Sequence, residues 1–115
     1  MSMSVDPVVK DVRHIVMARF KKDLGSHDVS KIKGALADVQ RNVKELKTWH
    51  CSFATDIGRA GEFRSTHSIV YQADFENHRD FTNAVHSQPF NDLRKMMEEY
   101  VDPSSVVRLQ CDVAR

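Results

Sequence analysis

The sequence predicts an α+β fold, a ferredoxin-like βαββαβ sandwich whose sheet faces the sheet of a second copy to form a dimeric α/β barrel. Strand and helix periods follow one another in the order strand, helix, strand, strand, broken helix, strand. Helices in this topology cover one face of the sheet, yet the first strand is apolar on both faces. A chain of 115 residues also leaves much surface exposed when it folds alone, so a partner subunit would stabilise it.

The first strand is expected over residues 12–20, after a flexible tail of residues 1–10 and at the start of a single domain of residues 11–115. Side chains on a strand alternate between its two faces. One face carries His14, Val16, Ala18 and Phe20. The other face carries Arg13, Ile15, Met17 and Arg19. We expect the face with His14 to line the barrel interior, between the two sheets.

An amphipathic helix is expected next, because apolar residues recur at steps of three and four between residues 29 and 46. A second strand follows at residues 48–55. One of its faces carries Trp49, Cys51 and Phe53. Residues 56–64 contain two glycines and no period, which predicts a flexible loop. The third strand is expected at residues 65–75. One of its faces carries His67, Ile69, Tyr71 and Ala73.

The second half of the chain predicts a helix divided in two. A short helix begins near Asn77 and is interrupted before Pro89, because proline fits the first turn of a new helix better than a helix interior. The new helix places on one stripe Phe90, Leu93, Met96 or Met97, and Tyr100. A turn at residues 102–105 leads to the last strand at residues 106–113.

Charge and composition exclude several classes of function. The formal net charge of +1 argues against a basic nucleic-acid surface or a polybasic membrane anchor. No apolar run approaches the length of about 18 residues that spans a bilayer, and residues 1–11 lack the apolar core of a secretory signal. Cys51 and Cys111 form no CxxC pair, and reduced thiols are favoured over a single disulfide. These features predict a cytoplasmic protein without nucleic-acid or membrane partners.

Four segments resemble the stress-responsive A/B barrel (Dabb) family. Residues 12–21 resemble its opening strand, a histidine and an apolar run that ends in Phe-Lys. Residues 66–77 resemble its third strand and the following turn, and residues 106–113 resemble its last strand. Residues 85–90 resemble a short motif at the helix break, usually His-Pro-x-His. The resemblance covers residues 11–113 and implies the same paired barrel.

The family includes plant stress proteins that form stable oligomers. It also includes polyketide cyclases of the olivetolic acid cyclase type, which close an aromatic ring inside the barrel without a metal or an organic cofactor. The resemblance therefore implies no cofactor here, and the sequence shows no metal-ligand spacing or GxGxxG motif. The cyclase uses a tyrosine and the second motif histidine, which fall on Asn83 and Pro89 in this chain. An identical mechanism is therefore not expected.

Three histidines are the candidate catalytic residues. The resemblance places the pocket histidines of the family on His14 and His67, the latter with an insertion of about two residues, and the first motif histidine on His86. Imidazole transfers protons near neutral pH. In the alternative interpretation, the strand histidines bond to backbone or water at the barrel mouth, and His86 caps a helix end.

The candidate ligand-binding residues are apolar or aromatic. They are Val16, Ala18, Trp49, Phe53, Ile69, Tyr71 and Phe90. The alternative is that these side chains only fill the interior of the barrel.

Two functions of different class follow from these residues. The first is an apolar pocket between the sheets of a homodimer that binds a small aromatic or polyketide-like molecule, with acid–base cyclase, isomerase or lyase chemistry. The second is a non-catalytic stress or oligomeric interaction protein. A third, weaker hypothesis is a subunit that modifies a partner synthase. The barrel alone does not choose among them.

Overall fold

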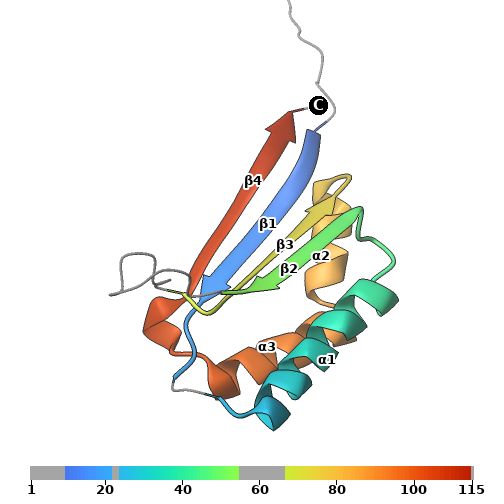
Figure 1. Ribbon diagram of the computed structural model, residues 1–115. Helices are drawn as coiled ribbons and strands as arrows, with labels where there is room; N and C mark the ends of the chain where they lie inside the picture. Colours follow the sequence, from blue (N-terminus) through green and yellow to red (C-terminus); the bar gives the residue numbers. More distant parts are fainter. Residues whose placement is uncertain (1–9, 22–23, 55–66, 115) are drawn as a thin grey trace, which may run out of the picture.

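The computed structural model describes residues 10–21, 24–54 and 67–114 (Figure 1). The elements are β1 (Lys10–Ala18), α1 (Ser26–Asn42), β2 (Thr48–Phe53), β3 (Ile69–Phe75), α2 (His78–Val85), α3 (Gln88–Tyr100), the 3-10 helix η1 (Pro103–Ser105) and β4 (Val107–Ala114). The predicted order with a divided second helix is confirmed. Most of the expected tail, the loop at residues 56–64 and the first part of the expected third strand lie outside the described residues.

The sheet has four antiparallel strands in the order β2-β3-β1-β4, so β1 and β3 are central as the topology predicts. His14 lies opposite Ala73 on β3 and opposite Gln110 on β4. Figure 1 shows the helices on one side of this sheet. The fold is therefore the ferredoxin-like α+β sandwich that the sequence predicts.

The core forms where the apolar stripes of the helices meet one face of the sheet. Ile32, Leu36 and Val39 form the buried stripe of α1. The buried residues of α3 are Phe90, Leu93 and Tyr100. Both stripes belong to one hydrophobic cluster with side chains of β1 and β3, so the two helices pack side by side on the sheet. Burial of these stripes, and not helix propensity, holds the helices in place.

The helix-covered face is the one that carries His14, which corrects the expectation that this face lies between two sheets. Val16 and Ala18 are only 3% and 0% exposed within a single chain. On β3, Ile69 and Tyr71 are buried in the same layer. Side-chain alternation shows which residues of β1 share a face. Because both faces are apolar, it does not show which face the helices cover. The pocket expected between sheets must therefore be sought between the sheet and its own helices.

The opposite face of the sheet carries an apolar surface that none of the described helices covers (Figure 1). It consists of Ile15, Met17, Val70, Val107, Leu109, Cys111 and Val113, which we call the open face. Val107 and Leu109 are 44% and 51% exposed. At one end of the same side, Arg13 donates two hydrogen bonds to the Asp74 carboxylate, at 2.9 and 3.1 Å. Exposed apolar surface of this kind marks an interaction site.

Candidate functional site

A pocket of about 600 Å³ lies between the sheet and helices α2 and α3. The sheet contributes His14, Val16, Tyr71, Arg108 and Gln110. The helices contribute Phe81, Val85, Phe90, Arg94, Met97 and Glu98. The segment between α3 and β4 contributes Val101, Pro103 and Val106. The volume is typical of a small-molecule site, and the wall is mostly apolar with a few polar groups.

His14 is the buried polar group of this pocket. Only 7% of the residue is exposed, because β1 is a central strand and α2 covers this part of it. Its ring lies 5.5 Å from the Phe81 ring and 6.0 Å from the Tyr71 ring, between centroids. The side-chain amide nitrogen of Gln110 lies 2.7 Å from Nδ1 of His14. An amide nitrogen donates, so Nδ1 accepts and the proton of the neutral imidazole sits on Nε2.

Two ionisable groups of the pocket are neutral at pH 7. Burial, and secondarily the positive charge of Arg108, lowers the pKa of His14 to about 4. Burial raises the pKa of Tyr71 to about 12. Within the described residues, the one hydrogen bond of the His14 ring is that of Nδ1 to Gln110, and the Tyr71 hydroxyl has none. Both groups are therefore available to a ligand.

The charged residues of the pocket lie at its rim. Arg94, Glu98 and Arg108 are exposed, so the pocket reaches solvent on the side of α3 and β4. Arg94 donates a hydrogen bond of 2.8 Å to the Val85 carbonyl and another to Oδ1 of Asn91. Both acceptors are neutral, so the positive charge of Arg94 is oriented without being neutralised.

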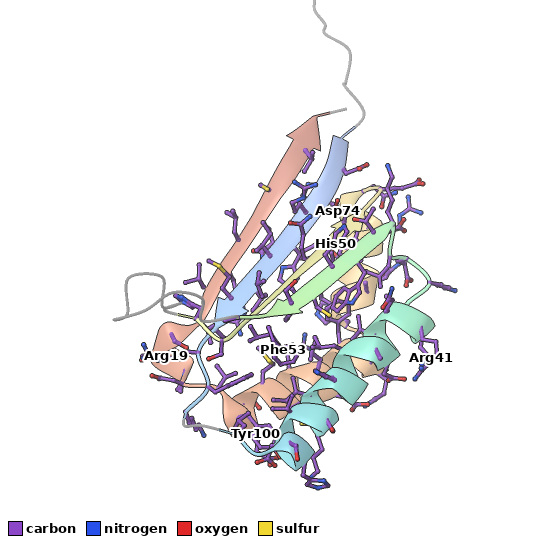
Figure 2. The ribbon with its side chains drawn as sticks, in the orientation of Figure 1. Arg19, Arg41, His50, Phe53, Asp74 and Tyr100 are labelled. Carbon is purple, nitrogen blue, oxygen red and sulfur yellow. The ribbon has the colours of Figure 1, made fainter. Side chains whose placement is uncertain are left out.

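Four of the residues expected to form the site do line this pocket. They are His14, Val16, Tyr71 and Phe90. The other expected ligand-binding residues belong to the core beside it. Ala18 and Ile69 are buried, and Trp49 stacks on Tyr71 with 5.4 Å between ring centroids. Phe53 packs against Phe20 in the layer between sheet and helices, as Figure 2 shows for Phe53.

The structure does not bring His67 and His86 to His14. Nε2 of His67 lies 3.1 Å from the Ser105 carbonyl oxygen, at the far end of the sheet. Since Ala18 pairs with Ile69, His67 lies about six residues, or about 20 Å, along the strand direction from His14. His86 is exposed, and its Nδ1 donates to the Thr82 carbonyl at 2.8 Å. His86 therefore closes the end of α2, as the alternative interpretation stated.

Sequence reasoning missed the polar residues that β4 contributes. Arg108 and Gln110 lie on the same face as Val106 by alternation, which is a readable signal. Arg108 and Gln110 lie near His14 because β1 pairs antiparallel with β4. In that pairing, Gln110 lies opposite His14 and Arg108 lies opposite Val16. That register is not visible in the sequence.

In residues 10–21, 24–54 and 67–114, no three His, Cys, Asp or Glu side chains gather in an arrangement that would hold a metal ion. None of the helices described combines the length and the apolar character that crossing a membrane requires.

Comparisons with known proteins identify a family and a set of structures that share the fold. The sequence model of the stress responsive A/B barrel domain matches residues 12–113. No curated protein matches the chain. Among solved structures, a hydroxynitrile lyase from Passiflora edulis is 27% identical, with a TM-score of 0.74. The match covers 93% of this chain and 96% of the lyase.

Two bacterial structures share the fold at lower identity. A dimeric ferredoxin-like protein of unknown function from Thermobifida fusca has a TM-score of 0.75 at 13% identity, covering 98% of this chain and 100% of that one. A Dabb family protein with a ferredoxin-like fold from Mesorhizobium loti has a TM-score of 0.65 at 10% identity, covering 92% and 97%. These two likenesses show the fold alone.

Proposed function

Because this chain belongs to the stress responsive A/B barrel domain family, we propose that its pocket binds a small aromatic molecule on which His14 moves a proton in lyase-type acid–base chemistry. The observation that carries this proposal is the state of His14. It is buried, neutral at pH 7 and oriented through Nδ1 by Gln110, while Nε2 has no hydrogen-bond partner within the described residues.

The wall of the pocket suits an aromatic or polyketide-like ligand. Tyr71, Phe81 and Phe90 offer ring surfaces, and Val16 and Val85 add aliphatic surface. Aromatic rings pack favourably edge to face or offset against one another, beyond the effect of buried area alone. A flat apolar ligand would therefore lie against these side chains, with its polar group toward His14.

The arrangement can serve the two proton transfers of a lyase. When a carbon–carbon bond beside a hydroxyl group breaks, the hydroxyl proton must leave and the electron pair passes to the departing carbon, which then takes up a proton. A half turn of the Gln110 amide would let it accept from Nδ1, so that Nε2 of His14 becomes the proton acceptor. Tyr71 keeps its proton and can donate a hydrogen bond to a carbonyl oxygen that forms.

Lyase chemistry is favoured over ring closure of the cyclase type. The similar hydroxynitrile lyase matches nearly the whole chain. Asn83 and Pro89, which stand at the cyclase positions, do not line the pocket. Acid–base chemistry of this kind needs only positioned groups, and one such group contributes about 100-fold or more to the rate.

We further propose that the open face pairs with the open face of a second copy. Exposed apolar residues such as Val107 and Leu109 favour this pairing, and the Thermobifida protein of the same fold is described as dimeric. A role in which the oligomer itself is the functional product, without catalysis, is the second candidate. It is supported by this surface, which does not involve the pocket.

Cleavage of an aromatic hydroxynitrile tests the catalytic proposal. The release of benzaldehyde from mandelonitrile would be followed with the purified wild-type protein and with the His14→Gln variant. We expect turnover by the wild type and a fall in kcat/KM of about 100-fold or more in the variant. His86→Ala is the matched control and should keep full activity, because His86 lies outside the pocket. Full activity in His14→Gln, or no turnover by the wild type, would contradict the proposal.

A further inference from the structure

We propose that the ligand of this pocket carries a carboxylate and that Arg108 binds it at the rim, while the ring of the ligand lies against the apolar wall. The inference rests on the proposed function and narrows its substrate class to small aromatic carboxylates. Three observations support the inference. They are the position of Arg108 beside His14, the net charge of the pocket rim, and the lack of an acidic partner for Arg108 within the described residues.

Arg108 lies at the rim of the pocket without an acidic partner, in contrast to three other arginines of the chain. Arg13, Arg19 and Arg41 each lie within ion-pair distance of an aspartate. In residues 10–21, 24–54 and 67–114, no carboxylate lies within that distance of Arg108, and no hydrogen bond holds its guanidinium. A guanidinium at the rim of an apolar pocket is well suited to bind a carboxylate through two parallel hydrogen bonds.

The register of β4 places Arg108 beside the acid–base group. Arg108 lies opposite Val16, and Gln110 lies opposite His14, so Arg108 and His14 are diagonal neighbours on one face. Diagonal neighbours of this kind are about 7–8 Å apart, and their Cβ atoms are somewhat closer. One small ligand can therefore reach both residues, with its carboxylate on Arg108 and a hydroxyl or carbonyl group at His14.

The rim carries a charge that matches one carboxylate. Among the described residues, those that carry charge at the rim are Arg94, Arg108 and Glu98, which leaves one net positive charge, since His14 and Tyr71 are neutral. Walls of low dielectric constant strengthen the field of such a charge inside a pocket. A carboxylate bears one negative charge and neutralises the rim, whereas a phosphate dianion would exceed it and would be repelled by Glu98.

The test compares three probes that share one ring and differ in charge. Benzoate, benzyl alcohol and phenyl phosphate would be titrated into the wild-type protein and followed by NMR chemical shifts, which suit weak binding. The same titrations would be made with Arg108→Gln and Arg108→Lys. Arg79→Gln is the matched control, because Arg79 is an exposed arginine of α2 that does not line the pocket.

We expect benzoate to bind the wild type about tenfold more tightly than benzyl alcohol, a preference that Arg108→Gln abolishes and Arg108→Lys keeps in part. Arg79→Gln should leave every dissociation constant unchanged. Equal binding of benzoate and benzyl alcohol, or a benzoate preference that survives in Arg108→Gln, would overturn this inference and leave the aromatic pocket standing. Tighter binding of phenyl phosphate would replace the carboxylate by a phosphate. Binding of none of the three probes would overturn the proposed function as well.

Discussion

Strand β1 is apolar on both of its faces, but only one of these faces is covered by the helices of the same chain. His14 and Val16 face the helices and are almost completely buried within one chain, whereas Ile15 and Met17 on the other face stay partly exposed. Helices α2 and α3 cover the first face without filling it, and the remaining space is the pocket. We therefore propose a different partner for each face, a small molecule for the helix-covered face and a second copy for the open face.

The charged groups of the two faces differ in the same way. On the open side, Asp74 is bound by Arg13 and Thr48, and the bonds from Arg13 are the main cause that lowers the pKa of Asp74. On the pocket side, Arg108 has no acidic partner among the described residues. Paired charges of the first kind serve the structure, while an unpaired charge beside a pocket is suited to a ligand.

The largest effect is expected from a cavity on the helix-covered side. Leu93 is fully buried between α3 and the sheet, so Leu93→Ala should lower the free energy of unfolding by about 2–5 kcal/mol. Urea unfolding at fixed protein concentration measures the change, with Lys95→Ala on the exposed side of α3 as the control. A loss below about 1 kcal/mol would mean that this layer is not the core of the fold.

A charged residue introduced on the open face should weaken dimer association rather than the stability of the single chain. Leu109 is 51% exposed on β4, and pairing of two open faces would bury it twice around the two-fold axis. Leu109→Asp should raise the dissociation constant of the dimer about 100-fold or more, because two carboxylates would lose water without gaining partners. Sedimentation measures this, with Gln40→Glu on the exposed side of α1 as the control. An unchanged dimer would show that pairing uses another surface.

Acid should weaken the fold through His14. The pKa of His14 falls from its ordinary 6.5 to about 4 on folding, so between these pH values the unfolded chain binds a proton that the folded chain does not. Stability should therefore decrease as the pH falls from 6.5 to 4, by up to about 3 kcal/mol from this group, with no further loss from it below pH 4. Urea unfolding across this range should show a shallower decrease in His14→Gln. Equal slopes in both proteins would contradict the burial of His14.

The smallest effect is expected from the cap of α2. The side chain of Asn77 accepts a hydrogen bond of 2.8 Å from the Asp80 amide, so Asn77→Ala should cost about 1 kcal/mol. Since α2 carries Phe81 and Val85 of the pocket wall, benzoate binding should weaken while sedimentation stays unchanged. Thr82→Ala, an exposed change in the same helix, should alter neither. Loss of the dimer in Asn77→Ala would show that the helix-covered face and the open face of the sheet do not act independently.

Periodicity predicted the elements because each has one apolar face that must be buried. Ile32, Leu36 and Val39 recur at helical spacing, and the structure confirms that they form the buried stripe of α1. Alternation also placed His14 and Tyr71 on one face, where they line the same pocket. The face that the helices cover was predicted incorrectly, since two apolar faces of one strand look alike in the sequence.

The remaining site residues depend on contacts between distant parts of the chain. Gln110 reaches His14 across 96 positions, through the pairing of β1 with β4. The family resemblance predicted His67 and His86 as site residues, but in the structure they contact the Ser105 and Thr82 carbonyls, away from the pocket. Local sequence shows which side chains share a face, whereas strand register and helix ends decide which of them meet.

Ligand binding by a monomeric variant tests most directly whether the pocket belongs to one subunit. Benzoate would be titrated into Leu109→Asp, under conditions in which sedimentation shows single chains. The pocket lies between β-strands and helices of the same chain, so we expect one ligand per chain and a dissociation constant within about threefold of the wild-type value. Loss of benzoate binding in the folded monomer would show that the site lies between subunits, and would contradict the account.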